Sequence, residues 1–122
     1  MKIVKGKDIA PIKRDDGRSI FQYGEQTLGF DIPKTSGVNF IRVTHPPNFT
    51  EEQHYHKKSY EIFYFLDPAK YRINGRDFDV DVWDLIVFEP NDFHGGLPTP
   101  NEVGLFIIQI PKILKEDKFF VR

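Results

Sequence analysis

The chain has 122 residues, with 17 basic and 18 acidic side chains, four histidines and no cysteine. This length is typical of one domain, so we expect a single domain over residues 1–122. The lack of cysteine excludes disulfide frameworks, thiolate metal sites and cysteine nucleophiles. Charge is nearly balanced, and no apolar run approaches the roughly 20 residues of a membrane span. We therefore expect no nucleic-acid partner and no membrane span. The charged N-terminus has no apolar signal core, and this, together with the lack of cysteine, predicts a cytoplasmic location.

Short apolar or alternating runs, separated by Gly, Pro, Asn and Asp, follow one another along the chain. Such runs predict β-strands. We expect strands at residues 27–32, 38–44, 61–66, 70–73, 77–82, 85–88 and 104–110. Seven to nine short strands predict an all-β fold, an antiparallel sandwich or small barrel. Helical periodicity is nearly absent, and we expect at most one short helical turn, at residues 112–118 near the C-terminus.

Asn74-Gly75 stands between two alternating runs. Asn-Gly in this setting predicts a tight hairpin, because both central residues of a type I′ turn need positive φ. In the second arm, alternation places Phe78, Val80 and Val82 on one face and three aspartates on the other. We expect the first face to be buried and the aspartates to be solvated.

His54 and His56 are two residues apart in a polar segment. On a strand, residues with this spacing point to the same face. Glu61 has the opposite parity and opens an apolar strand, where a carboxylate is costly unless it is paired or ligated. A turn across residues 57–59 would bring it to the two imidazoles. The alternatives are an exposed polar loop for the histidines and a surface pairing of Glu61 with a neighbouring lysine.

A second segment has an apolar strand at residues 85–88, followed by a Glu-Pro-Asn-Asp turn that leads to His94. His94 is either a ligand or a turn residue bonded to the backbone. His45 lies outside both segments and is expected to be structural or exposed. Three imidazoles and one carboxylate suit zinc, iron, manganese, nickel or cobalt, with positions left for water or substrate. An all-oxygen calcium or magnesium cage does not suit this set.

These two segments resemble the two motifs of the cupin superfamily, which are small jelly-roll β-barrels. The first motif, G-x5-H-x-H-x(3,4)-E-x6-G, resembles residues 48–68, with Asn48 and Pro68 in place of its glycines. The second, G-x5-P-x-G-x2-H-x3-N, resembles residues 83–98. There Trp83 replaces the first glycine and Asn91 the central one. Asn is a mild replacement, because it tolerates positive φ.

The resemblance implies a small single-domain cupin whose barrel mouth holds a divalent metal bound by His54, His56, Glu61 and His94. It implies an enzyme of dioxygenase, isomerase, decarboxylase or lyase type, with Glu61 as a ligand or general base. The alternative is a non-catalytic cupin that binds or senses a small molecule. Cupins commonly pair through outer strands, so we expect a homodimer, with residues 3–4 and 119–121 as candidate outer strands.

If Glu61 points inward, parity places Phe63 and Phe65 beside it in the pocket wall, and we add Phe88 as an apolar wall residue. Gln109, a lone amide in an apolar strand, either faces solvent or hydrogen-bonds in the pocket. Arg42 either contacts an anionic substrate group or is an exposed strand residue.

Overall fold

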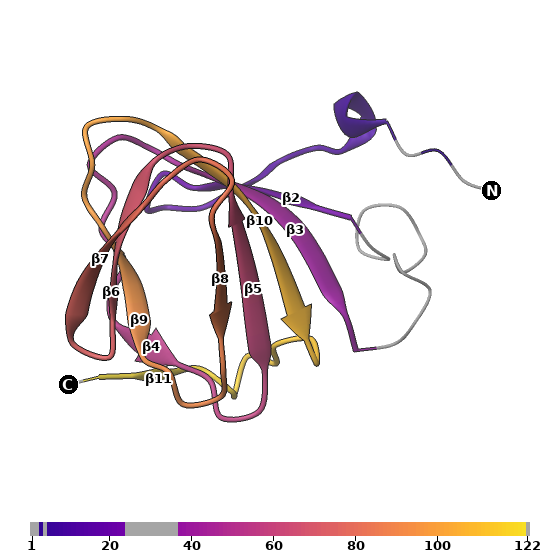
Figure 1. The fold of residues 1–122 in the computed structure, drawn as a ribbon. Coiled ribbons are helices and arrows are strands. Elements are labelled where there is room, and N and C mark those ends of the chain that lie inside the picture. The colour runs from indigo at the N-terminus through magenta and orange to yellow at the C-terminus, as the bar shows by residue number, and fades with distance from the viewer. Residues whose placement is uncertain (1–2, 4, 24–36, 122) are drawn as a thin grey trace.

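The protein, described here from a computed structural model over residues 3, 5–23 and 37–121, consists of two facing antiparallel sheets (Figure 1). One sheet has six strands in the spatial order β1 (Ile12–Lys13), β2 (Ser19–Gln22), β3 (Asn39–His45), β10 (Val103–Ile110), β5 (Tyr60–Phe65) and β8 (Leu85–Phe88). The other has five, in the order β11 (Phe119–Phe120), β4 (His54–Tyr55), β9 (His94–Leu97), β6 (Ala69–Ile73) and β7 (Arg76–Val80).

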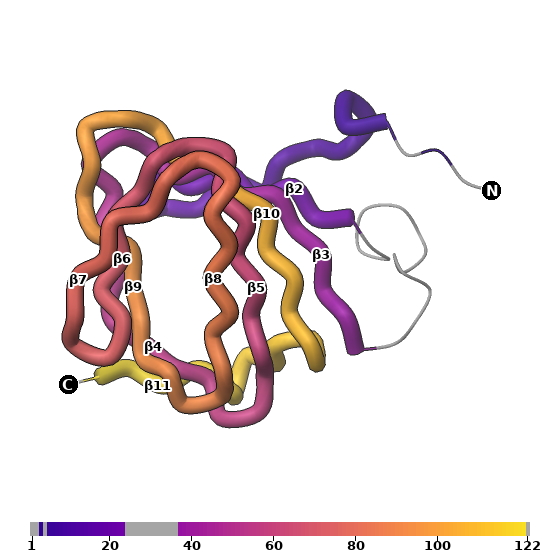
Figure 2. The backbone as a smooth tube through the Cα atoms, viewed as in Figure 1, coloured from indigo at the N-terminus to yellow at the C-terminus, as the bar shows by residue number. Residues whose placement is uncertain are grey.

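From β5 to β10 the chain crosses repeatedly from one sheet to the other, and this path can be followed along the tube in Figure 2. This confirms the expected all-β antiparallel jelly-roll class. Within the described part of the chain, no ladder of hydrogen bonds joins one sheet to the other, so the barrel is a pair of facing sheets rather than a closed cylinder. Nor does that part contain a helix long and apolar enough to cross a membrane.

Six of the predicted strands correspond to β3, β5, β6, β7, β8 and β10. The strand predicted at residues 27–32 lies outside the described residues. Sequence patterning did not identify β1 and β2, which form a short antiparallel hairpin at the edge of the six-stranded sheet. Four alternating residues in β2 are too few to stand out, and the pairing of β2 with β3 supplies what the local pattern lacks.

The Asn-Gly hairpin is confirmed, because Asn74 and Gly75 have φ values of 50° and 81° and join β6 to β7. The predicted burial of the second arm is correct in part. Val80 is buried, but Phe78 is exposed. The reason is position, since β7 is an edge strand of the five-stranded sheet and its outer end has little to pack against.

The sequence allowed at most one short helical turn, at residues 112–118, and the structure forms none there. That segment contains a turn at residues 115–116 and no helix. Both oxygens of the Asp117 carboxylate accept backbone hydrogen bonds, from the amides of Lys57 (2.9 Å) and Lys58 (3.1 Å). These bonds hold the segment against the loop before β5.

The chain then forms β11, which pairs with β4 of its own chain, although this end was a candidate outer strand for a partner. The one 3-10 helix in the described part is η1 (Gly6–Asp8) near the N-terminus.

Three residues that replace glycines of the cupin motifs have left-handed backbone conformations. Asn48, Trp83 and Asn91 have φ values of 62°, 74° and 75°. An L-residue in this region is strained, and a bulky one more so than Asn. The turns of the motifs are therefore retained although their glycines are not.

The core lies between the sheets and is made by the inward positions of alternating strands. Phe65 and Leu105 are completely buried. Full burial of a side chain of this size contributes about 1.5–3 kcal/mol. The cluster consists of Ile20, Ile41, Val43, Phe63, Phe65, Ala69, Tyr71, Val80, Phe88, Val103, Leu105 and Ile107.

Candidate metal centre

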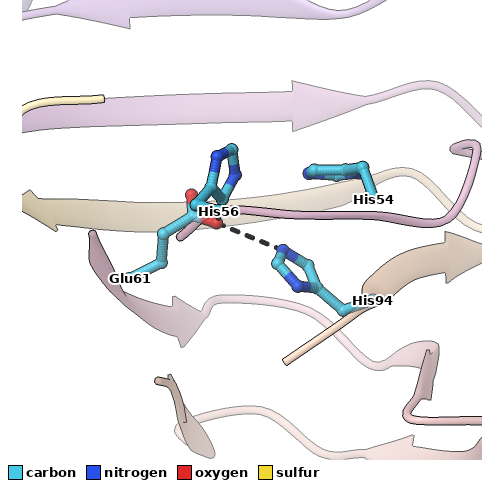
Figure 3. A group of neighbouring side chains, drawn as sticks. All are labelled: His54, His56, Glu61 and His94. Carbon is cyan, nitrogen blue, oxygen red and sulfur yellow. Dashed lines mark hydrogen bonds and ion pairs between the residues drawn. The ribbon is translucent and has the colours of Figure 1, made fainter. Parts of the chain in front are cut away.

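His54, His56, Glu61 and His94 converge between the sheets, with one ligand atom of each within 4.8 Å of all the others (Figure 3). His54 and His94 are register partners on β4 and β9, so their imidazoles are neighbours across the ladder. Glu61 reaches them from β5 in the opposite sheet. The chain bends at residues 57–58, which gives Glu61 the face that strand parity alone denies it. All four residues are buried.

Each imidazole is oriented by a backbone carbonyl. Nδ1 of His54, His56 and His94 donates to the carbonyl oxygens of Glu52 (3.0 Å), Asp117 (2.6 Å) and Asp92 (2.9 Å), respectively. Because a carbonyl oxygen can only accept, all three Nδ1 atoms carry a proton. The Nε2 atoms are then left to face the centre of the group. This is the arrangement that holds metal-binding histidines in one tautomer and one ring orientation.

The shortest distances at the centre join the Glu61 carboxylate to two imidazole nitrogens, and they require a positive charge between these atoms. Oε1 of Glu61 lies 3.2 Å from Nε2 of His56 and 3.1 Å from Nε2 of His94. With Nδ1 protonated, a neutral imidazole presents a lone pair to the carboxylate, and two acceptors repel each other. Protons or a metal cation relieve this repulsion. Two atoms bound to one tetrahedral zinc lie about 3.4 Å apart, so the group could hold a metal ion between Glu61, His56 and His94.

Glu61 is also held from its other side by a row of amides across three strands. Oε2 of Glu61 accepts from Gln109 Nε2 (3.0 Å), and Oε1 of Gln109 accepts from Asn39 Nδ2 (2.7 Å). Asn39 Oδ1 in turn accepts from Gln22 Nε2 (2.7 Å). Asn39, Gln109 and Glu61 are register partners on β3, β10 and β5. Of the two roles left open for Gln109, the structure thus supports the hydrogen-bonding one, and the row leaves Oε1 for the histidines.

Electrostatics divides the group into charged and uncharged members. Burial lowers the pKa of His54 to about 4, and neighbouring His94 adds to the effect. For His56, burial opposes protonation, but the hydrogen bond and charge of Glu61 prevail and raise its pKa. Burial alone would raise the pKa of Glu61, yet its hydrogen bonds to His56 and His94 hold it far below the usual range. Glu61 is therefore an anionic donor at neutral pH, beside an uncharged His54.

A cavity of about 390 Å³ opens onto this group. His54, His56 and Glu61 line it, while His94 is buried behind them. Of the residues expected in the pocket wall, Phe63 and Gln109 also line the cavity.

Two of the expected wall residues lie in the core instead. Phe65 packs against the rings of Phe63 and Tyr71. Phe88 stacks on His94, with ring centroids 3.9 Å apart and an interplanar angle of 15°. Phe88 thus supports a candidate ligand from behind.

Arg42 does not line the cavity. Alternate residues of β3 line the cavity, namely Asn39, Ile41, Val43 and His45, so alternation directs Arg42 to the opposite face. There its guanidinium lies over the ring of Phe21, 3.8 Å from the centroid. This is the exposed-strand alternative, and it removes Arg42 as a contact for substrate in this cavity.

Sequence reasoning missed much of the polar lining. Glu51 lines the cavity, and its carboxylate pairs with Arg18 (3.2 Å). His45 lines it too and packs on the ring of Phe49, 4.5 Å away. A signal was present in Asn39, a polar side chain at an inward position of an apolar strand. Arg18 and Glu51 are 33 residues apart in the sequence, so no local sequence pattern could predict their pairing.

No protein-family model matches the chain, and no curated protein sequence matches it either. Solved structures do resemble it. A predicted oxalate decarboxylase from Thermotoga maritima superimposes with a TM-score of 0.77 at 18% identity, over 90% of this chain and 99% of that one. KdgF from a Halomonas species superimposes with a TM-score of 0.77 at 11% identity, over 93% of this chain and 96% of that one.

The polyketide cyclase RemF from Streptomyces resistomycificus gives a TM-score of 0.75 at 18% identity, over 100% of this chain and 86% of that one. The nucleoside dehydratase Pac13 gives a TM-score of 0.73 at 14% identity, over 100% of this chain and 92% of that one. At these identities the likeness concerns the fold. The chain has the cupin fold, as the two motifs implied.

Proposed function

We propose that this protein is a metal-dependent enzyme that converts a small organic molecule in the cavity beside His54, His56, Glu61 and His94. The observation that carries the proposal is the set of three backbone carbonyls that fix the imidazoles with Nε2 facing the Glu61 carboxylate. Three imidazoles and a carboxylate suit zinc, iron, manganese, nickel or cobalt. When bound, such a metal acts as a Lewis acid on a substrate oxygen.

The chain's own residues supply the rest of the site. Gln109 holds Oε2 of Glu61, so Glu61 has a fixed orientation whether it serves as ligand or as general base. Phe63 and Ile107 give the cavity an apolar wall that limits water. Enzymes of this fold named above catalyse unlike reactions, so the fold selects no reaction among oxygenation, isomerisation and elimination.

Elemental analysis of protein purified without chelator or nickel resin tests the metal. Wild type is expected to carry about one transition-metal ion per chain, because a buried preorganised site binds tightly. The double variant His54→Ala/His94→Ala is expected to carry less than a tenth of that. His45→Gln, which changes a cavity histidine outside the group, is the matched control and keeps the metal. The proposal is overturned if wild-type protein is metal-free and its melting temperature does not change on addition of zinc, manganese, iron, nickel or cobalt.

A screen of small organic acids, sugars and nucleosides by mass spectrometry separates an enzyme from a binding module. Conversion of one compound by the loaded wild type, lost in Glu61→Gln with metal retained, supports catalysis and an acid–base role for Glu61. A compound that is bound and returned unchanged points to the non-catalytic alternative.

We also propose that two copies pair through the outer face of the six-stranded sheet. Outward positions on β3, β5, β8 and β10 carry one charged residue, Arg42, and are otherwise mostly apolar. Leu85 and Val87 on the edge strand β8 are 55% and 51% exposed. A face of this extent is unusual on a monomer. The apolar outward residues are Phe40, Tyr60, Ile62, Tyr64, Leu85, Val87, Phe106, Ile108 and Ile110.

Light scattering during gel filtration checks this pairing. Wild type is expected to elute with twice the mass of the chain, and Leu85→Glu/Val87→Glu as a folded monomer, because charges directly opposed across a two-fold interface repel. Val121→Glu, at an exposed position beside β11 on the far edge of the other sheet, is the control and stays dimeric. A monomeric wild type at 100 µM (about the highest working concentration) contradicts the pairing.

A further inference from the structure

We propose that the cavity takes a small anionic substrate, with a terminal carboxylate or phosphate held by Lys115, Lys118 and Arg14 at its mouth. The three cations are exposed yet line the cavity, which places them at its entrance. The buried His54, His56 and Glu61 form its inner end. The inference rests on the proposed function, because it assumes that the substrate's other end faces those residues.

The cavity lining concentrates positive charge in a chain that is slightly acidic overall. Its formal net charge is −1, yet the lining contains four Lys or Arg side chains and two carboxylates. Both carboxylates are engaged, Glu61 by histidines and Glu51 by Arg18. Arg18 is itself neutralised by Glu51 and by Asp16 (2.9 Å). The surplus of positive charge therefore belongs to the cations at the mouth.

Lys115, Lys118 and Arg14 form no ion pair with any carboxylate among the described residues. The ammonium of Lys118 lies 5.4 Å from the centroid of the Phe120 ring, which positions it without cancelling its charge. Cations that converge on a concave surface attract and hold anions more strongly than the same charges on a flat surface.

The segment that carries two of these cations is fixed to the candidate metal centre. The Asp117 carboxylate accepts from the backbone amides of Lys57 and Lys58, and its carbonyl oxygen accepts from Nδ1 of His56. Lys115 and Lys118 flank this anchor. The mouth and the inner end are therefore held at a constant separation by one short piece of chain.

Size and lining restrict the rest of the molecule. A cavity of about 390 Å³ is near the lower end of the range for small-molecule sites. Between the two ends, one wall is apolar, with Ile20, Ile41 and Val43, and another offers the amide of Gln109. The fitting class is a compact acid or phosphate ester with an oxygen function at its opposite end, such as a hydroxy acid, a keto acid or a sugar phosphate.

Titration calorimetry with charged and uncharged probe pairs tests the proposal. The pairs are malonate against malonamide, and glycerol phosphate against glycerol, each with metal-loaded and chelator-treated protein. At least one anion is expected to bind at least tenfold more tightly than its neutral partner in both preparations, with weaker binding at higher salt. The pair that responds distinguishes carboxylate from phosphate.

The double variant Lys115→Ala/Lys118→Ala is expected to weaken anion binding at least tenfold. Lys70→Ala/Arg72→Ala removes two cations that pair with Asp79 and Asp77 on β6 and β7, away from the cavity, and is expected to change nothing. Equal binding of both members of each pair, no binding of any probe, or equal losses in the two double variants overturns the inference. Metal content measured on the same samples separates this failure from that of the proposed function.

Discussion

Metal-free protein is expected to lose about 3 kcal/mol of stability between pH 7 and pH 4 through His45 alone. Burial lowers the pKa of His45 to about 4, the positive charge of Arg18 adds to this, and Asp16 opposes it. The unfolded chain has a histidine pKa near 6.5, so below that pH the unfolded state binds a proton that the folded state refuses. Stability is therefore complete above pH 6.5 and declines down to pH 4.

The other groups of the cavity change this profile in known directions. The pKa of His54 is also lowered to about 4, so His54 adds a second loss of folding stability over the same pH window. The raised pKa of His56 acts oppositely, since its contribution is present at acid pH and declines as the pH rises through the folded pKa. The depressed pKa of Glu61 adds stability that is lost at still lower pH. The pKa of Glu51, raised by burial, opposes the loss as His56 does, so His45 and His54 are the groups that destabilise the fold as the pH falls from 6.5 to 4.

His45→Gln isolates the largest single contribution outside the candidate ligands. Urea unfolding of chelator-treated protein at pH 7.5, 5.5 and 4.5 is the measurement. The variant is expected to lose less stability than wild type on acidification, by about 2.5 kcal/mol at pH 4.5. Parallel pH profiles for the two proteins would show that His45 is not held uncharged. Wild type with bound metal is expected to be more stable at neutral pH and to lose that extra stability steeply on acidification, because the ligands must be deprotonated to hold the metal.

Much of the fold could be predicted because the central strands carry their own pattern. β3, β5 and β10 alternate inward and outward residues over six to eight positions, and they are neighbours in the sheet. The two-residue strands β1 and β11 were not predicted from alternation because they depend on their partners. The path of the segment before β11 was not predicted, because Asp117, which anchors it, has its partners about 60 residues earlier.

The candidate site divides in the same way. The spacing of His54 and His56, and the cost of placing Glu61 in an apolar strand, identify a cluster from sequence alone. What orients the cluster is remote or carries no side-chain signal. The carbonyl groups that fix the histidines belong to the backbone, and Gln109 lies 48 residues from Glu61. Sequence predicts which donors are present, while the contacts that fix their tautomers and separations come from the tertiary structure.

Phe88→Leu is expected to weaken metal binding by tenfold or more while leaving the protein folded. The Phe88 ring stacks on His94 and also meets the ring of Phe63, with centroids 4.8 Å apart. Removing the ring frees the His94 imidazole to rotate, and changes in the groups that support a metal ligand typically cost about 10–100-fold in affinity. The smaller side chain also leaves space in the core, at a cost of about 1–3 kcal/mol.

Phe65→Leu is the matched control, because it makes the same substitution at an equally buried core position. Phe65 is completely buried and packs on Phe63 and Tyr71. Both variants are expected to lose similar stability in urea unfolding, whereas metal affinity, measured by competition with a coloured chelator, falls in Phe88→Leu alone. Equal metal affinities in the two variants would mean that the Nδ1 bond to the Asp92 carbonyl suffices to orient His94. A fall in Phe88→Leu alone would mean that ring stacking and the carbonyl bond act together, so the aromatic core is part of the machinery that presents Nε2 to the metal.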